Sequence, residues 1–231
     1  MLKDKTIIII GASSGLGSVL ADNLFTNNNV IGTYNRHKIK AKYETIKCDV
    51  TKEKDVKKLF SYALKKYHKI DAVISMISYT EDTDLKDKSY KSFLRVINAN
   101  LGGTFIVNKY AALNMQEGVI LNMSSMDAHD TFSAYSIDYA ASKAGIENIT
   151  KNFAKMMPNL KIYALAPAWI DTKAVLEMDP KYLKREMERN GQQKLLKKED
   201  VVLKIIDIIT GSNYKSGNII RMDGKDEKFI R

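Results

Sequence analysis

The stretch Thr6-Ile7-Ile8-Ile9-Ile10-Gly11-Ala12-Ser13-Ser14-Gly15-Leu16-Gly17 decides the fold of this chain. Its apolar, β-branched half predicts a buried strand, and the glycines that follow it open directly onto a stretch of helical period. A strand, a glycine-rich loop and a helix start together predict a site where backbone N–H groups hold a pyrophosphate. The spacing is G-x-x-x-G-x-G, which differs from the G-x-G-x-x-G of many dinucleotide-binding proteins.

Strand-like and helix-like stretches alternate from this point to the end of the chain. The segment from Lys54 to Tyr67 is typical of the helices, because its apolar residues fall on one face. Such alternation predicts a parallel sheet with right-handed crossovers and helices on both faces. We therefore expect an α/β, doubly wound Rossmann fold, a single domain over residues 1–231 with a seven-stranded, mostly parallel sheet. The expected strands after the first are Asn29 to Tyr34, Tyr43 to Cys48, Asp71 to Ile77, Gly118 to Met123, Lys161 to Ala166 and Asn218 to Met222.

Composition narrows the class of protein. The chain has 231 residues, 45% of them hydrophobic, which is enough for one core of useful size. Cys48 is the only cysteine, so an intrachain disulfide is excluded, and the one Cys and three His show no metal-ligand spacing. We expect a cytoplasmic, metal-free protein. The apolar run near the N-terminus is too short for a signal peptide or a membrane span.

The charge balance raises the question of a nucleic-acid partner. Lys and Arg number 37 against 27 Asp and Glu, giving a net charge of +10. The basic residues are scattered through every predicted helix, often beside acids, and form no tract interleaved with aromatic residues. We therefore expect a solvated, lysine-rich surface, with no nucleic-acid and no membrane partner. The excess positive charge can still attract an anionic cofactor or substrate.

A second motif, Tyr139-Ala-Ala-Ser142-Lys143, lies in a segment of helical period. Four residues make one helical turn, so the phenol and the ammonium leave the same face. A neighbouring ammonium favours the phenolate, which makes the pair a candidate general acid/base. Taken alone, the same spacing also fits an ordinary surface pair.

Together, the glycine loop and the Tyr/Lys pair resemble the short-chain dehydrogenase/reductase family, and within it the 3-oxoacyl-carrier-protein reductases. Further stretches around Asp49, Asn100, Ser125 and Pro167 match the family in the expected order, so the resemblance covers almost the whole chain. The resemblance implies a catalytic set of Asn100, Ser125, Tyr139 and Lys143. It also implies a cofactor site formed by Gly11, Ser13, Ser14, Gly15, Leu16, Gly17, Asn35, Arg36, Asp49, Val50, Ser75, Tyr139, Lys143, Pro167, Ile170 and Thr172.

The activity that this resemblance implies is reduction of a ketone or 3-oxo group to a secondary alcohol, or the reverse. Ser125 would hydrogen-bond the substrate oxygen, and Tyr139 would protonate it. Lys143 would lower the pKa of the phenol and hold the ribose of the nicotinamide, while Asn100 would anchor a water that relays protons. A homodimer or homotetramer is implied as well.

The residues after the second predicted strand bear on the choice of cofactor. Enzymes of this fold that prefer NAD carry an acid there for the ribose 2′-OH, whereas a 2′-phosphate calls for an Arg. No acid occurs between Val30 and Tyr43, and Arg36 is placed to bind the phosphate, with Asn35 and Lys38 beside it. We therefore expect NADP(H) to be preferred over NAD(H). A solvated basic turn is the alternative.

Several departures from the family pattern leave alternatives open. Ser75-Met76-Ile77-Ser78 replaces the family's Asn-Asn-Ala-Gly, which allows a catalytically silent NADP(H)-binding sensor or scaffold protein. Ser125 stands fourteen residues before Tyr139 rather than thirteen, and we prefer it to Ser124. The tyrosine position of the enoyl reductases is Ser136 here, which favours carbonyl and alcohol chemistry.

Substrate identity is the least determined expectation. Basic residues follow Pro167 in a charged, helix-prone segment and could meet an anionic or thioester-linked small molecule, namely Lys181, Lys184, Arg185 and Arg189. A solvated helix face explains the same residues without a ligand. A Ser/His/Asp hydrolase using His129 and Asp130 is disfavoured, because the chain has no G-x-S-x-G nucleophile elbow.

Overall fold

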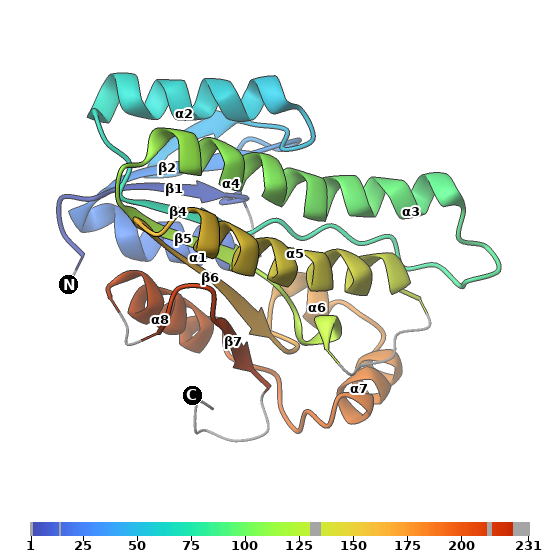
Figure 1. The fold of residues 1–231 in the computed structure, drawn as a ribbon. Helices are drawn as coiled ribbons and strands as arrows, with labels where there is room; N and C mark the ends of the chain where they lie inside the picture. The colour runs from blue at the N-terminus through green and yellow to red at the C-terminus, as the bar shows by residue number, and fades with distance from the viewer. Residues whose placement is uncertain (1, 14, 130–134, 212–213, 224–231) are drawn as a thin grey trace.

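The computed structural model describes residues 2–13, 15–129, 135–211 and 214–223. Seven parallel strands form one sheet in the order β3-β2-β1-β4-β5-β6-β7 (Figure 1). Their bounds are β1 (Thr6–Ile10), β2 (Asn29–Tyr34), β3 (Glu44–Lys47), β4 (Ala72–Ser75), β5 (Gly118–Met123), β6 (Leu160–Pro167) and β7 (Ile219–Met222). The predicted doubly wound fold is confirmed.

The isoleucines of β1 show why this strand lies in the middle of the sheet. Side chains alternate between the two faces of a strand, so Ile7 and Ile9 point to one side, while Ile8 and Ile10 point to the other. Ile7 and Ile9 belong to one buried cluster, and Ile8 and Ile10 belong to a second. A strand that is buried on both faces must be apolar at every position, which is what the run of four isoleucines supplies.

Helices cover each face of the sheet (Figure 1). Residues of α1 (Gly15–Leu24) and α8 (Lys198–Ile209) pack with the cluster around Ile7 and Ile9. The other cluster includes residues of α2 (Glu53–Tyr67), α4 (Gly103–Asn114) and α5 (Ile137–Met156). The remaining helical elements are η1 (Phe25–Asn27), α3 (Tyr90–Ile97), η2 (Asn98–Gly102), η3 (Met126–Ala128), α6 (Lys173–Leu176) and α7 (Pro180–Arg189).

Predicted and observed elements agree, with small shifts at the ends. The helix predicted from Lys54 begins at Glu53 and buries Val56, Leu59 and Phe60 as its pattern indicates. The third strand is shorter than predicted and begins at Glu44; the hydroxyl of Tyr43, just before it, donates to the carbonyl of Ala12 at 2.8 Å.

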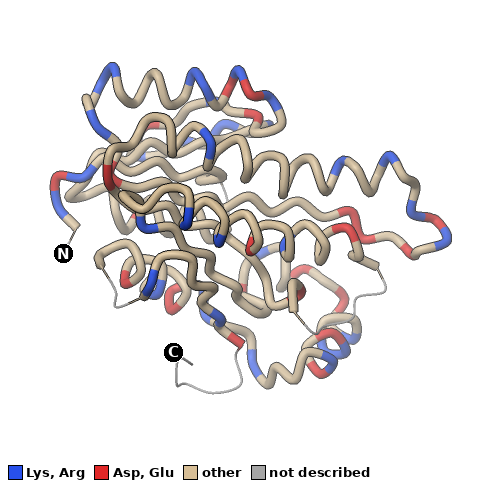
Figure 2. The backbone as a smooth tube through the Cα atoms, viewed as in Figure 1, with Lys and Arg blue, Asp and Glu red and all other residues tan. Residues whose placement is uncertain are grey.

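The sheet topology fixes where a ligand can bind. Connections run outward in opposite directions from β1 and β4, and open α/β sheets bind ligands in the crevice at the carboxyl ends of such strands. Figure 2 shows Lys and Arg distributed along most helices, with acids interspersed on α7. Within the described part of the chain, no helix is long and apolar enough to cross a membrane.

Candidate active site

One large cleft, about 1140 Å³ in volume, lies at the carboxyl ends of the central strands. It runs from the glycine loop after β1, past the ends of β4 and β5, to α6 and α7. Its size is sufficient for a dinucleotide together with a small substrate. We call its glycine-loop end the cofactor half and its α7 end the substrate half.

The glycine loop has the backbone geometry that a dinucleotide site needs. Gly11 and Gly15 adopt positive φ angles of 82° and 55°, which favour glycine. A Cβ on Gly17 would lie 2.3 Å from the carbonyl oxygen of Gly11, so the turn closes onto α1 only with glycine there. The loop leads into the N-terminus of α1, where the helix dipole favours a phosphate. These residues therefore fit a nicotinamide dinucleotide, which would supply the hydride-transfer chemistry when bound.

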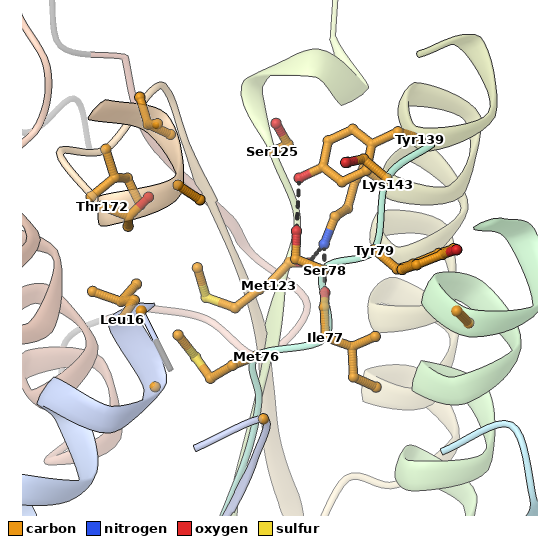
Figure 3. Close-up of a pocket in the computed structure, with 18 of the residues that line it drawn as sticks. Leu16, Met76, Ile77, Ser78, Tyr79, Met123, Ser125, Tyr139, Lys143 and Thr172 are labelled. Carbon is orange, nitrogen blue, oxygen red and sulfur yellow. Dashed lines mark hydrogen bonds between the residues drawn. The ribbon is translucent and has the colours of Figure 1, made fainter. Parts of the chain in front are cut away.

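Tyr139 and Lys143 lie one turn apart on α5, at the centre of the cleft (Figure 3). Lys143 is only 1% exposed, and its Nζ donates hydrogen bonds of 2.8 Å to the carbonyls of Ile77 and Met123. The same Nζ lies 5.3 Å from the ring centroid of Tyr139. The phenol oxygen of Tyr139 lies 3.4 Å from Oγ of Ser78. The end of β5 and the segment just after β4 thus hold the ammonium near the phenol.

Burial controls the ionisation of this pair. It raises the pKa of Tyr139 to about 12, and the negative charge of Asp127 acts in the same direction. It lowers the pKa of Lys143 to about 7, although Asp127 opposes that change. We expected Lys143 to lower the pKa of the phenol; in this structure desolvation outweighs that effect, because it disfavours the charged form of both groups. At neutral pH the phenol therefore carries its proton.

The two serines that end β5 have different surroundings. Ser124 is buried and also lines the cleft, but its Oγ donates to Glu147 Oε1 at 2.8 Å. Ser125 caps η3: its Oγ accepts a hydrogen bond from the N–H of Asp127 at 3.1 Å, and it lies 3.3 Å from Asp127 Oδ2. Figure 3 shows the Ser125 hydroxyl near the phenol of Tyr139. This geometry favours Ser125 over Ser124 as the serine that reaches a substrate.

Asn100 occupies a π-helical turn, η2, between α3 and α4. Its side chain is fully buried and does not line the cleft. Oδ1 accepts from the N–H of Tyr79 at 2.8 Å, while Nδ2 donates to the carbonyl of Tyr79 at 2.9 Å and to Ser142 Oγ at 3.0 Å. The observed contacts of Asn100 therefore fix the segment beside Ser78 to α5, and π-helical turns of this kind often occur at functional sites.

Most of the predicted cofactor residues line the cleft, and one does not. The lining includes Gly11, Ser13, Gly15, Leu16, Gly17, Asn35, Arg36, Asp49, Val50, Pro167, Ile170 and Thr172. Ser14 lies outside the described residues. Ser75, which we expected at the cofactor, does not line the cleft. It is 1% exposed and lies within β4, paired with Ile10 of β1 and Asn122 of β5.

The Asp49 carboxylate already has local partners. Its Oδ1 accepts from the N–H and the hydroxyl of Thr51 at 3.1 and 2.7 Å, and its Oδ2 pairs with Lys52 at 3.2 Å. These contacts lower the pKa of Asp49, against the effect of its partial burial. The side chain therefore shapes the turn before α2 as well as lining the cofactor half.

Sequence reasoning missed several residues of the substrate half. Ser78 lines this half. The hydroxyl that it brings, where the resemblance led us to expect a glycine, could have pointed to it. The other residues lie in the loops and on or next to α7, and no sequence motif predicts that these segments reach the cleft. They are Asp82, Asp127, Tyr182, Glu186 and Asn190. His129 does not pair with Ser125; its Nε2 lies 3.0 Å from Glu147 Oε1. Asp130, the other member of the disfavoured hydrolase site, lies outside the described residues.

A buried ion pair anchors the start of α5 beside Tyr139. Lys88 donates to Asp138 Oδ2 and to the carbonyl of Glu81, each at 2.7 Å. The side chains of Lys88 and Asp138 are 4% and 0% exposed. This contact joins the loop after β4 to the first turn of α5, so it helps to place the Tyr139 phenol.

Comparison with known proteins agrees with this geometry. The family model described as enoyl-(acyl carrier protein) reductase matches residues 12–224. The chain is 27% identical to 3-oxoacyl-[acyl-carrier-protein] reductase FabG of Thermotoga maritima, covering 96% of this chain and 98% of that protein. It is 28% identical to ipsdienol dehydrogenase of Ips pini, over 74% and 76% of the two chains.

Solved structures give the same result. The ligand-free aldohexose dehydrogenase of Thermoplasma acidophilum superposes with a TM-score of 0.84 at 27% identity, covering 96% of this chain and 94% of that one. A short-chain dehydrogenase of Burkholderia cenocepacia in complex with NADP has a TM-score of 0.86 over 96% and 98% of the chains; at 20% identity it supports the fold alone. The chain therefore belongs to the short-chain dehydrogenase/reductase family, whose members are NAD(P)-dependent oxidoreductases.

Proposed function

We propose that this protein reduces a ketone or 3-oxo group to a secondary alcohol with NADPH, or runs the reverse reaction. The observation that carries the proposal is the placement of Tyr139 above the buried Lys143, with the Ser125 hydroxyl beside it, in the same cleft as the glycine loop. A bound nicotinamide would supply or accept the hydride. The protein then has to orient a carbonyl and handle one proton.

The side chains divide these tasks. In our proposal, Ser125 and the Tyr139 phenol donate hydrogen bonds to the substrate oxygen, and Tyr139 passes its proton to that oxygen. Because burial raises the pKa of Tyr139 to about 12, the phenol is protonated at neutral pH and ready to act as the acid. Burial lowers the pKa of Lys143 to about 7, so Lys143 can exchange a proton near neutrality and return one toward the phenol.

The preference for NADPH rests on the turn after β2. Asn35 and Arg36 line the cofactor half, and both are exposed there. An Arg in this position suits a 2′-phosphate, because its planar group can make charge-assisted hydrogen bonds to phosphate oxygens. No acid lies between Val30 and Tyr43 to accept a ribose 2′-OH in its place. Relatives named as 3-oxoacyl-carrier-protein reductases are consistent with ketone reduction.

The proposal includes assembly into a homodimer or homotetramer. Leu94 of α3 and Phe105 of α4 are 42% and 47% exposed. Together with Leu101 of η2 and Ile149 of α5, they line a shallow, mostly apolar groove about 850 Å³ in volume. Exposed apolar surface of this kind on neighbouring helices is typical of subunit contacts.

The proposed function is tested by NADPH oxidation, followed by absorbance, with a panel of small ketones and 3-oxo thioesters. We expect turnover by the unmodified protein and a loss of about 10²- to 10⁴-fold for Tyr139→Phe, because general acid catalysis contributes that much. Tyr135→Phe is the matched control, since Tyr135 is not among the residues that line the cleft and its ring packs against that of Tyr182, with centroids 6.1 Å apart. Tight NADPH binding without turnover of any panel member would contradict the proposal and favour a sensor.

A further inference from the structure

Three carboxylates from separate parts of the chain line the substrate half of the cleft. Asp82 follows β4, Asp127 lies in η3 and Glu186 lies on α7. Burial is the main cause that raises the pKa of Asp82 and of Asp127, and the charge of Glu186 raises both further. The three acids therefore share one part of the cleft lining with Tyr139, and the charges of Asp127 and Asp82 also raise the pKa of its phenol.

One oxygen of the Glu186 carboxylate, Oε1, accepts no hydrogen bond from a described residue. The side chain is only 4% exposed although it lines the cleft. Its Oε2 lies 3.1 Å from Arg189 Nη1. Its Oε1 is buried and makes no hydrogen bond with any described residue; the nearest cation, Arg185 Nε, stands 3.5 Å away. A buried carboxylate oxygen without a hydrogen bond is costly, so a ligand donor that reaches it gains binding energy.

We propose that the substrate is a carbonyl or alcohol compound rich in hydrogen-bond donors, neutral or cationic, whose hydroxyl or amino groups bind Asp82, Asp127 and Glu186, and that anionic substrates are rejected. This inference rests on the proposed function, because it concerns the same cleft. It names what that site accepts beyond the reacting carbonyl.

The basic residues of α7 do not oppose this assignment. Lys184 pairs with Glu188 at 3.8 Å, and neither residue lines the cleft. Arg185 and Arg189 both form ion pairs with Glu186, and these pairs offset much of their positive charge. None of the four basic residues that we expected to attract an anionic group is among the described residues that line the cleft.

The cations nearest the other two carboxylates are also engaged. Lys88, whose charge lowers the pKa of Asp82, forms the buried pair with Asp138. Lys143 is held by two backbone carbonyls. The hydroxyl or amino groups of a substrate can therefore meet these acids without displacing either lysine from its partners.

Asp127 adds a link between recognition and catalysis. It accepts from Ser125 Oγ at 3.3 Å and returns a backbone N–H at 3.1 Å. A substrate donor bound to Asp127 would therefore lie close to Ser125 and Tyr139, whose hydroxyls we propose to contact the reacting oxygen. Tyr182 and Asn190 complete the polar wall around this position.

The test compares four ketones of similar size with NADPH: dihydroxyacetone, aminoacetone, acetoacetate and butanone. They carry hydroxyl donors, an ammonium, a carboxylate and no donor, respectively. We expect kcat/KM for dihydroxyacetone or aminoacetone to exceed that for butanone by about 10- to 100-fold, because hydrogen bonds to charged groups contribute that much. Acetoacetate should be the poorest of the four. The two donor ketones distinguish a hydroxylated substrate from a cationic one.

Variants locate the effect. Glu186→Gln and Asp82→Asn should each lower the preference for the donor ketone over acetoacetate by about tenfold. Asp82 lies in a loop outside the helices and strands, so its variant should fold even where a change at the buried Glu186 does not. The matched control is Glu188→Gln on the same helix, paired with Lys184 outside the cleft, which should leave the preference unchanged.

Saturation-transfer NMR on the NADP-loaded Tyr139→Phe protein measures binding without turnover. The donor ketones should give signals that Glu186→Gln weakens, and acetoacetate should give none. Equal kcat/KM for butanone and the donor ketones, or stronger binding of acetoacetate, would overturn the inference while leaving carbonyl reduction intact. Absence of turnover together with donor-ketone binding would instead contradict the proposed function alone, and absence of both would overturn the inference as well.

Discussion

The hydroxyl of Ser78 lies 3.4 Å from the phenol oxygen of Tyr139. The hydrogen bond lowers the pKa of Tyr139, opposing the larger effect of burial. Ser78 follows directly after Ile77, whose carbonyl holds Lys143. One short segment after β4 therefore contacts both members of the pair that we propose moves the proton.

Ser78→Gly should slow turnover without weakening NADPH. Loss of one hydrogen bond to the phenol corresponds to a decrease in kcat of about two- to tenfold. It should also move the alkaline limb of the pH profile of kcat upward, because that bond favours the phenolate. Steady-state kinetics across pH, with the Kd of NADPH measured by fluorescence titration, test this. A change confined to KM would show that Ser78 contacts substrate rather than Tyr139.

Ser125→Ala and Ser124→Ala should fail in different ways. We expect Ser125→Ala to lower kcat while the protein stays as stable as before, because the Ser125 hydroxyl lies in the cleft near the Tyr139 phenol. Ser124→Ala leaves the buried Glu147 carboxylate without the 2.8 Å hydrogen bond, so it should lower the free energy of unfolding by about 1–3 kcal/mol. Urea unfolding and kinetics on both variants separate the two effects. Equal loss of kcat would mean that Ser124 also reaches the substrate.

How much the sequence predicts differs between the two halves of the cleft. The doubly wound fold and the glycine loop follow from local patterns, since the alternation of strands with helices and the glycine spacing permit few alternatives. Tyr139 and Lys143 share one helix, so their neighbourhood follows from the 3.6-residue period. Asp82, Asp127 and Glu186 line one cleft only because the segments after β4 and β5 and helix α7 come together there, and no spacing along the chain encodes that.

Two expectations changed for physical reasons. Ser75 was expected at the cofactor, yet it remains inside the β4 ladder, and the chain reaches the cleft only from Met76 onward. The pKa of Tyr139 was expected to fall beside Lys143. A one-dimensional pattern shows that an ammonium is near but not that both groups are desolvated, and desolvation is the larger cause here.

The buried Lys143 should give the cofactor-free protein a distinctive pH dependence of stability. Its pKa is about 7 in the folded protein, against 10.5 for the unperturbed group. Between these values the unfolded chain binds more protons than the folded one, so the free energy of unfolding rises with pH across about pH 7 to 10. Lys143→Met removes this contribution. The difference in unfolding free energy between the two proteins should therefore shift in favour of the unmodified protein as pH rises.

Urea unfolding at pH 6, 7, 8 and 9 tests this, and the comparison with Lys143→Met cancels contributions that both proteins share. Tyr139 contributes in the opposite direction only above pH 10, where the unfolded phenol ionises before the folded one. A difference that does not vary between pH 6 and 9 would mean that Lys143 stays fully charged in the folded protein, held by the carbonyls of Ile77 and Met123.

Arg36→Ala should reduce the preference for NADPH over NADH. Arg36 is exposed in the cofactor half, where a 2′-phosphate can approach it. A hydrogen bond to a charged group is worth about 1.5–3 kcal/mol, so the unmodified protein should bind NADPH about 10- to 100-fold more tightly than NADH. The variant should lose most of this ratio through weaker NADPH binding, with the Kd of NADH unchanged.

Lys38→Ala is the matched control for Arg36→Ala. It removes the same charge two residues along, but Lys38 is not among the described residues that line the cleft. Fluorescence titrations with both cofactors should give the control protein an unaltered ratio. Because the Arg36 contact is ionic and exposed, the ratio of the unmodified protein should also fall between about 50 mM and 500 mM salt. Equal losses in both variants would instead assign the preference to general surface charge, which the +10 net charge of the chain could supply without any specific contact.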